Sequence, residues 1–284
     1  MPHIDDPWNL GDISPLLEHG PVGTSAPCRI DCGGTLDIGT FHYPLRHLGP
    51  STVNIALDLR TAVTLMPAAA DRIQIASKGV AEAAFKPTCA PYDHPLGLMF
   101  AVADYFGARG VRIQIDSASP PQSGLGGSSV AAVALIAAFS KVLVRLGQPA
   151  IGREGMVLLA HAVEQAVAGV PCGLQDQLAA AFGGVNLWTW PARADRTPFA
   201  RRPLLRTADQ ARLDDHLLVA YLGVRHVSKD VNTTWVRQFI TAESRDQWRA
   251  IVGLTGEFAD ALGRGDMRSA AAAASAYKSG FELD

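Results

Sequence analysis

Residues 119–129 read Ser-Pro-Pro-Gln-Ser-Gly-Leu-Gly-Gly-Ser-Ser, and this glycine-rich stretch organises the chain. Residues 111–116 before it alternate apolar and polar side chains, which predicts a half-buried strand. Residues 130–144 after it are rich in Ala, Leu and Val and predict a buried helix. A glycine-rich turn between a strand and a helix leaves backbone N–H groups at the helix start, where the helix dipole favours a phosphate. We therefore interpret the stretch as a nucleotide phosphate loop.

Two better-known phosphate loops do not match this stretch. The Walker loop requires a Lys after its glycines, and none follows here. The dinucleotide fingerprint requires Gly or Ala where Ser129 stands. The alternative is a tight turn without a ligand, in which a serine such as Ser128 only caps the helix.

The bulk properties exclude several classes of protein. The chain has 284 residues, enough for one large domain or two modest ones, and a formal net charge of −2 that does not favour nucleic acid or an anionic membrane. Its 4 cysteines lack zinc-type or disulfide-framework spacing and fit a reducing cytoplasm. No apolar run is long enough to span a membrane, and the N-terminus lacks the pattern of a signal peptide. We therefore expect a cytoplasmic protein.

Hydrophobic periodicity predicts the remaining elements of a mixed α+β chain. Residues 1–26 are expected to form an irregular leader with a helical turn at 14–19, and the Pro-containing basic stretch 191–206 is the predicted domain boundary. The predicted strands are 51–65, 72–77, 185–190 and 216–223, and the predicted helices are 95–107, 153–168, 178–182 and 267–277.

Three polar features lie outside the phosphate loop. Residues 28–37 place Arg29 and Asp37 around a Gly-Gly pair, which suits either a ligand-binding loop or a hairpin turn with a surface ion pair. Glu164, on the predicted helix 153–168, is either a metal ligand or a solvent-exposed carboxylate. Asp176, near a predicted helix start, is either functional or simply an N-cap.

Together, three segments resemble the GHMP kinase superfamily, which includes galactokinase, homoserine kinase, mevalonate kinase and phosphomevalonate kinase. Residues 121–129 (PQSGLGGSS) match its second motif, P-x-S/G-x-G-L-G-S-S, with Gly127 in place of the first Ser. Residues 28–37 (CRIDCGGTLD) are similar to the first motif of fucose and heptose-phosphate kinases. Residues 169–177 (GVPCGLQDQ) resemble the galactokinase pattern G-x-P-C-G-x-x-D-Q. The co-occurrence of the segments in this order is more specific than any one of them.

The resemblance implies a two-domain fold that binds ATP and Mg²⁺. Residues 27–205 would form the ATP-binding domain, similar to domain 2 of ribosomal protein S5, and residues 206–284 a smaller α+β domain that is apparently truncated. Ser128 and Glu164 would bind Mg²⁺, which prefers a few protein oxygens together with phosphates. The residues implied to contact the ATP phosphates are Pro121, Ser123, Gly124, Leu125, Gly126, Gly127, Ser128 and Ser129.

The resemblance also implies the residues that act on the substrate. Asp176 would be the general base or would orient the sugar hydroxyl, and Arg29 would keep it ionised and offset charge on the phosphoryl group. Asp37 would accept hydrogen bonds from sugar hydroxyls. The full set of implied substrate residues is Asp37, Gly33, Gly34, Thr35, Cys172 and Gly173.

The resulting hypothesis is an ATP- and Mg²⁺-dependent kinase that phosphorylates the anomeric hydroxyl of heptose 7-phosphate, fucose or galactose, as a monomer or homodimer without nucleic-acid or membrane partners. Arg225, His226 and Lys229 are either binders of a substrate phosphate or a solvated loop. The third family motif, G-A-G-G-G, is not found. The alternative is therefore a catalytically impaired relative that binds sugar and ATP as a sensor.

Overall fold

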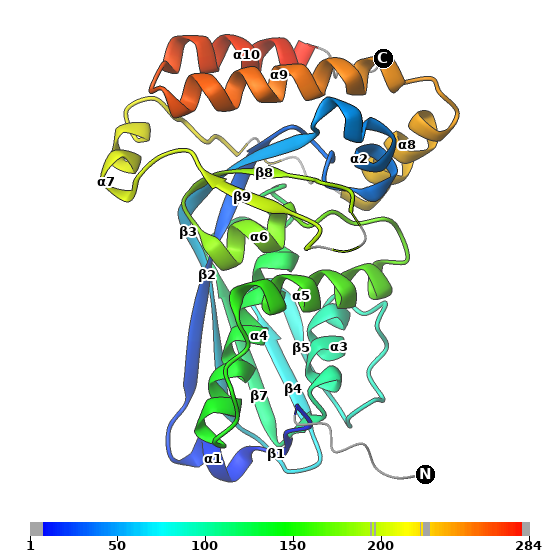
Figure 1. Ribbon diagram of the computed structural model, residues 1–284. Coiled ribbons are helices and arrows are strands. Elements are labelled where there is room, and N and C mark those ends of the chain that lie inside the picture. The colour runs from blue at the N-terminus through cyan, green and yellow to red at the C-terminus, as the bar shows by residue number, and fades with distance from the viewer. Residues whose placement is uncertain (1–7, 194, 196, 222, 224–227, 280–284) are drawn as a thin grey trace. The chain divides into compact units, whose positions relative to one another are not determined.

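The computed structural model describes residues 8–193, 195, 197–221, 223 and 228–279 (Figure 1). The protein has a mixed α+β fold, as predicted, and its chain divides into two compact units. Unit 1 comprises residues 1–28 and 58–169, and unit 2 comprises residues 29–57 and 170–284. The chain passes between them within strands β2 (Val22–Cys32) and β3 (Ser51–Pro67) and again after residue 169.

Unit 1 is built on the second half of β3. Residues 61–67 of β3 pair antiparallel with β7 (Val111–Ser117). Strand β7 pairs in parallel with β4 (Ile73–Ser77). Strand β4 in turn pairs antiparallel with the edge strand β5 (Val80–Phe85). On β7 the side chains of Val111, Ile113 and Ile115 are buried while Asp116 is exposed, so the period of two predicted from sequence is observed. Near the N-terminus, β1 (Gly11–Asp12) pairs in parallel with β6 (Ala108–Arg109), and α1 (Ser14–Glu18) follows β1.

Helices α3 (Gly97–Tyr105), α4 (Gly127–Arg145) and α5 (Arg153–Ala168) complete unit 1 and contact one another (Figure 1). Helix α4 is the central element, because apolar side chains around its whole circumference are buried. Within the described residues, α4 alone is long and apolar enough to cross a membrane, but 72% of that window is buried inside the protein. Its hydrophobicity is therefore that of a core helix.

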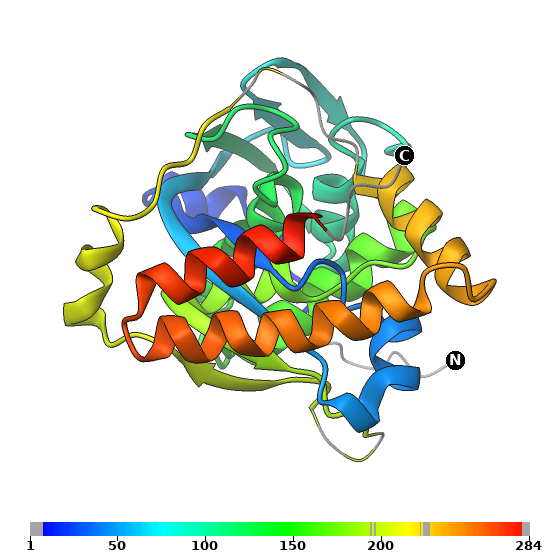
Figure 2. The same cartoon turned by 90° about the horizontal axis from the view of Figure 1, so that it is seen from above.

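Unit 2 is built on the first half of β3. Residues 51–55 of β3 pair antiparallel with β8 (Val185–Thr189), and β8 pairs antiparallel with the edge strand β9 (Ala200–Pro203). The helices of this unit are α2 (Gly39–Leu45), α6 (Gln175–Phe182), α7 (Thr207–Gln210), α8 (Ser228–Ile240), α9 (Arg245–Gly263) and α10 (Met267–Ser279), with 3₁₀ turns at Arg46–Leu48 and Ala211–Leu213. Helices α9 and α10 pack side by side (Figures 1 and 2).

Two groups of buried apolar side chains stabilise unit 2. The first, called here the Cys32 cluster, consists of Cys32, Val53, Ile55, Val185, Leu187, Leu213, Ala259, Ala261, Leu262 and Ala270. The second, called here the Trp248 cluster, consists of Leu36, Ile38, Phe41, Leu45, Phe239, Trp248, Ile251 and Val252. The two clusters contain the residues directly before and after the Gly33–Thr35 segment, so burial fixes both ends of that loop.

The unit boundaries differ from the predicted domain boundaries. Strand β2 begins at Val22, inside the segment expected to be an irregular leader. The stretch 191–206, expected to separate two domains, contributes β9 to the sheet of unit 2. The physical reason is that β2 and β3 each run through both units, so each unit is assembled from segments distant in sequence.

The predicted strand at 216–223 is not observed. Residues 217–221, which the structure describes, belong to no strand, and 89% of the Leu218 side chain is exposed. An apolar run of this kind resembles a strand in sequence, but a strand also requires a neighbouring strand to accept and donate its backbone hydrogen bonds.

We expect Trp248→Ala to lower the free energy of unfolding by about 3–5 kcal/mol, because it removes a large buried side chain and leaves a cavity. The Trp248 ring is 2% exposed and its centroid lies 4.1 Å from that of Phe41. Urea denaturation measures the change. Ile240→Ala is the control, because Ile240 is 62% exposed, and an equal effect of both substitutions would contradict the packing described here.

Candidate active site

In unit 1, the glycine-rich loop lies between β7 and α4, as predicted. Its backbone adopts positive φ angles at Gln122 (55°), Gly124 (76°) and Gly126 (77°). Gly126 is the N-cap of α4, and no side chain caps this end of the helix. The first N–H groups of α4 therefore have no side-chain acceptor, and an anion could serve as one.

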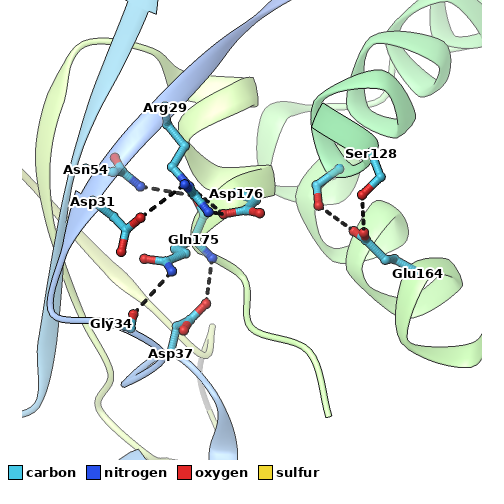
Figure 3. A network of polar contacts seen from close by, with 10 residues as sticks. Arg29, Asp31, Gly34, Asp37, Asn54, Ser128, Glu164, Gln175 and Asp176 are labelled. Atoms are coloured by element: carbon cyan, nitrogen blue, oxygen red, sulfur yellow. Dashed lines mark hydrogen bonds and ion pairs between the residues drawn. The ribbon is translucent and has the colours of Figure 1, made fainter. Parts of the chain in front are cut away.

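The serines at the start of α4 bind a carboxylate and do not act as caps. Ser128 Oγ donates to Glu164 Oε1 at 3.0 Å, and Ser129 Oγ donates to Glu164 Oε2 at 2.7 Å (Figure 3). The interpretation of this stretch as a turn with a serine cap is therefore wrong. Glu164 comes from α5, so two helices bring three oxygen-bearing side chains together. Hard oxygen donors of this kind fit Mg²⁺, which takes its remaining ligands from water and phosphate.

A chain of hydroxyl groups supports the beginning of this loop. Thr61 Oγ1 lies 3.0 Å from Ser117 Oγ, which in turn lies 3.0 Å from Ser119 Oγ. The contacts join β3 to the end of β7 and to the first residue of the loop. Sequence reasoning did not identify this support, because the Thr61–Ser117 pairing exists only in the register of the two strands. The loop then continues through the other predicted phosphate contacts, Pro121, Ser123, Leu125 and Gly127, which are exposed or half-buried.

In unit 2, Arg29 connects two carboxylates. Its Nε donates to Asp176 Oδ1 at 2.6 Å, Nη2 lies 2.6 Å from the same oxygen, and Nη1 lies 3.1 Å from Asp31 Oδ1 (Figure 3). Burial by itself would lower the pKa of Arg29, but Asp176 and Asp31 raise it above its usual value. Arg29 thus remains protonated beside Asp176, the arrangement expected from the family resemblance.

Asp31 is the residue of this group that sequence reasoning did not assign. It stands two positions after Arg29 on β2, and alternate residues of a strand face the same side. The two-residue spacing between Arg29 and Asp31 was the sequence signal that could have identified Asp31. The Asp31 side chain is 21% exposed, so it lies at the edge of the group and the Arg29 side chain, 11% exposed, lies deeper.

Asp37 caps the amino end of the helix that carries Asp176. Its Oδ2 accepts a hydrogen bond from the backbone N–H of Gln175, the first residue of α6, at 2.9 Å (Figure 3). The carboxylate reaches this position because Gly173 has no side chain: a Cβ atom there would lie 1.7 Å from Asp37 Oδ2. Asp37 and Gly173, both predicted to bind substrate, are thus in direct contact.

The environment of Asp37 favours its protonated form. Asp37 is 4% exposed, and burial, opposed by the Gln175 hydrogen bond and reinforced by Asp176 and Asp31, raises its pKa to about 7. Among the described residues, Asp37 Oδ1 and Thr35 Oγ1 are buried without a hydrogen-bond partner. A buried oxygen without a hydrogen-bond partner costs free energy of folding. Asp37 Oδ1 is therefore a candidate to accept a hydrogen bond from a ligand hydroxyl, and Thr35 Oγ1 is a candidate to donate or accept one.

Backbone contacts hold the remaining predicted substrate residues. Gly33 has φ +108° and lies so close to β3 that a Cβ would be 2.9 Å from Ser51 O. The Gly34 carbonyl accepts a hydrogen bond from Gln175 Nε2 at 3.2 Å, and Cys172 Sγ lies 3.4 Å from Val170 O. The Gly-Gly pair therefore lies in a loop packed against β3 and bonded to Gln175 of α6, and it is not a hairpin turn with a surface ion pair.

Asn54 is a second residue that sequence reasoning missed. It is 0% exposed on β3; its Nδ2 donates to the Gln175 carbonyl at 3.0 Å, and its Oδ1 accepts from Trp188 Nε1 at 3.0 Å. These bonds tie the start of α6 to β3 and β8. An Asn between Val53 and Ile55 in a predicted strand was the available sequence signal.

The structure therefore forms two groups from the predicted residues: Ser128, Ser129 and Glu164 in unit 1, and Arg29, Asp37, Gly173 and Asp176 in unit 2. Of the basic residues proposed for a substrate phosphate, Arg225 and His226 lie outside the described residues, as does the side chain of Lys229.

The raised pKa of Asp37 makes stability depend on pH. Between the usual value of 3.8 and about 7, the folded protein keeps a proton that the unfolded chain has lost, so the free energy of unfolding falls as pH rises through this window. Asp37→Asn keeps an oxygen for Gln175 but cannot titrate. We expect a flatter pH dependence from urea denaturation, whereas the exposed-site control Asp71→Asn should retain the wild-type slope. A wild-type slope in Asp37→Asn would contradict the assignment.

Gly173→Ala tests the close approach of Asp37. The new Cβ cannot fit, so the Asp37 carboxylate or the 170–174 segment must move and the bond to Gln175 is lost. We expect the free energy of unfolding to fall by about 1–3 kcal/mol, as for other overpacked sites. Gly152→Ala is the control, since no atom lies within 4 Å of its added Cβ. Similar stabilities of both variants in urea would show that the contact is not tight.

Comparison with known proteins agrees with this geometry. Residues 94–184, which include the glycine-rich loop, Glu164 and Asp176, match the family model for the GHMP kinases N terminal domain. No curated protein sequence matches the chain.

Solved structures match most of its length. A D-glycero-D-manno-heptose 1-phosphate kinase from Bacteriodes thetaiotaomicron has a TM-score of 0.71 and 21% identity, with 93% of this chain and 80% of that chain covered. Galactokinase of Lactococcus lactis, complexed with galactose, has a TM-score of 0.63 and 15% identity, with coverage of 96% and 79%. Mevalonate kinase of Methanococcus jannaschii has a TM-score of 0.57 and 12% identity, with coverage of 89% and 80%.

At these identities the structural matches show the fold. The predicted resemblance is confirmed: the chain has the fold of the GHMP kinase superfamily, and residues 94–184 match the model of that superfamily's N-terminal domain.

Proposed function

We propose that this protein is an ATP- and Mg²⁺-dependent sugar kinase that phosphorylates the anomeric hydroxyl of a sugar or sugar phosphate. The observation that carries the proposal is the Arg29–Asp176 ion pair beside a buried Asp37 whose Oδ1 atom has no partner among the described residues. A carboxylate paired with an arginine, next to an acceptor for ligand hydroxyls, suits the transfer of a phosphoryl group to a polyol.

The nucleotide is assigned to unit 1. The uncapped N–H groups at the start of α4 suit the ATP phosphates, because the helix dipole favours negative charge there. Ser128 and Glu164 would hold Mg²⁺, which supplies positive charge to the phosphate oxygens. Ser128 is exposed and Ser129 is 4% exposed, so Ser128 is the better candidate for a direct ligand and Ser129 orients Glu164.

The sugar is assigned to unit 2. In the reaction, the hydroxyl oxygen forms a bond to the γ-phosphorus, the bond to the β–γ bridging oxygen breaks, and ADP leaves. Asp176 accepts the hydroxyl proton or orients the hydroxyl while the proton passes to solvent. Both contacts that Arg29 makes with Asp176 go to Oδ1, so Oδ2 is the Asp176 oxygen that we assign to the substrate. The Arg29 charge also offsets charge on the transferring phosphoryl group.

Heptose 7-phosphate, fucose and galactose are the proposed substrates. The named relatives include a heptose 1-phosphate kinase and a galactokinase, and the first motif is similar to that of fucose and heptose-phosphate kinases. The proposal places the reaction in the cytoplasm, with a monomeric or homodimeric enzyme and neither nucleic acid nor membrane as partner.

A sensor that binds sugar and ATP without turnover is the second candidate. Asp176, Glu164 and Ser128 favour the enzyme, because binding alone does not require a carboxylate paired with a buried arginine.

A sugar-dependent ADP-release assay with a panel of hexoses and heptose phosphates tests the proposal, together with Asp176→Asn. We expect turnover in wild type and a loss of about 10²–10⁴-fold in Asp176→Asn, because the base or orienting carboxylate is gone. Calorimetry should show unchanged ATP binding, and the exposed Asp71→Asn serves as the control. Binding of sugar and ATP without ADP release would support the sensor. Neither binding nor turnover would exclude both functions.

A further inference from the structure

His42 is the polar member of the buried face of α2 in unit 2. Phe41 and Leu45, the apolar members of that face, pack in the Trp248 cluster, and the His42 side chain is 6% exposed. A buried imidazole requires a hydrogen-bond partner, and His42 Nδ1 lies 3.3 Å from the backbone carbonyl oxygen of Leu36. Neither the family resemblance nor the sequence analysis assigned a role to this histidine.

The contact with Leu36 fixes which ring nitrogen carries the proton. A carbonyl oxygen can only accept a hydrogen bond, so His42 Nδ1 is the donor. Burial lowers the pKa of His42 below its usual value of 6.5, so the ring is neutral near pH 7 and its single proton lies on Nδ1. Two aromatic rings restrict the imidazole further: the ring centroid of Tyr43 lies 4.8 Å away and that of Trp190 lies 6.0 Å away.

The Leu36 carbonyl belongs to the peptide unit that leads into Asp37. Because a peptide unit is planar, a bond that fixes this C=O group also fixes the direction of the Asp37 N–H group and limits where the Asp37 Cα can lie. Leu36 stands between Thr35 and Asp37, each of which has a buried oxygen without a hydrogen-bond partner among the described residues. Residues 33–37 are thus held from α2 by His42 and from α6 by Gln175.

We propose that His42 is a positioning residue for sugar binding, whose Nδ1–H group holds the Leu36 carbonyl and so fixes the segment that presents Thr35 and Asp37 to the substrate. This inference rests on the proposed sugar-kinase function. His42 does not contact the reacting atoms in this assignment. Its contribution is to remove conformational freedom from the segment before the sugar arrives, which favours binding.

Two substitutions separate the hydrogen bond from the packing of the ring. His42→Leu removes the donor and keeps an apolar side chain, whereas His42→Asn removes the ring and keeps an N–H donor at the position of Nδ1. We expect KM for the sugar to rise about three- to tenfold in His42→Leu, the factor for one hydrogen bond, and to stay within about twofold of wild type in His42→Asn. In both variants kcat and KM for ATP should stay within about twofold. A sugar KM in His42→Asn as high as in His42→Leu overturns the proposal.

His94 in unit 1 provides the matched control. Its Nδ1 accepts a hydrogen bond from the Leu96 backbone N–H at 3.0 Å, and its ring centroid lies 6.2 Å from that of Phe100. His94→Leu therefore also removes an imidazole that bonds the backbone and packs on an aromatic ring, and it should leave KM for the sugar unchanged. An equal rise in His94→Leu and His42→Leu would contradict a specific role of His42.

Hydrogen exchange separates this inference from the proposed function. The Ile38 N–H donates to the Thr35 carbonyl at 2.9 Å, so its exchange reports opening of the segment. In full-length protein without substrate, exchange should be about three- to tenfold faster in His42→Leu and close to wild type in His42→Asn and His94→Leu. Unchanged exchange in His42→Leu, or an unchanged sugar KM in an active enzyme, overturns the role of His42. If exchange changes as expected but wild type phosphorylates no sugar, His42 still positions the segment and the sugar-kinase assignment is what fails.

NMR of the imidazole nitrogens tests the bond in the wild-type protein, and it decides the matter even if His42→Leu does not fold. We expect a neutral His42 ring with its proton on Nδ1 near pH 7. A neutral ring with its proton on Nε2 could not donate to the Leu36 carbonyl, and that result would overturn the proposal.

Discussion

The contact between the Asp37 carboxylate and the first N–H of α6 is the constraint on which the candidate sugar site depends. It joins a loop from the start of the chain to a helix more than a hundred residues later. A carboxylate at a helix N-terminus is favoured by the helix dipole and satisfies a backbone donor that no side chain of α6 caps. The next residue of that helix is Asp176, so the same contact sets the position of the proposed base relative to the loop.

Burial restricts the movement of these groups and also raises the pKa of Asp37. Asp37, Gln175 and Asn54 are all buried, so each unsatisfied atom among them is costly and each bond restricts its neighbours. The only buried cation close to these carboxylates in the described chain is Arg29, and it is engaged by Asp176 and Asp31. Burial, reinforced by the charges of Asp176 and Asp31, raises the pKa of Asp37 to about 7. A site with one carboxylate paired to an arginine and a second whose pKa lies near 7 can accept hydrogen bonds from a neutral polyol.

The proposed nucleotide site follows a different principle. There the important groups are backbone N–H groups and hard oxygens, arranged by glycines with positive φ and by the junction of α4 with α5. Such a loop could be predicted from sequence because its requirements are local: glycine where φ is positive, small side chains at the helix start, and an apolar helix behind it. Helix α5 was predicted with its observed bounds for the same reason, since its periodicity is contained within the segment.

The sequence by itself predicted many of the helices and strands, the glycine-rich loop before α4 and most residues of the candidate site, because these depend on local patterns and on motifs that occur in a fixed order. Only the tertiary structure decided which strands pair, that β2 and β3 run through both units, that residues 217–221 form no strand, and that Asp31 and Asn54 adjoin the candidate site. These features arise from strand register and packing between residues far apart in the chain, and no local pattern carries that information.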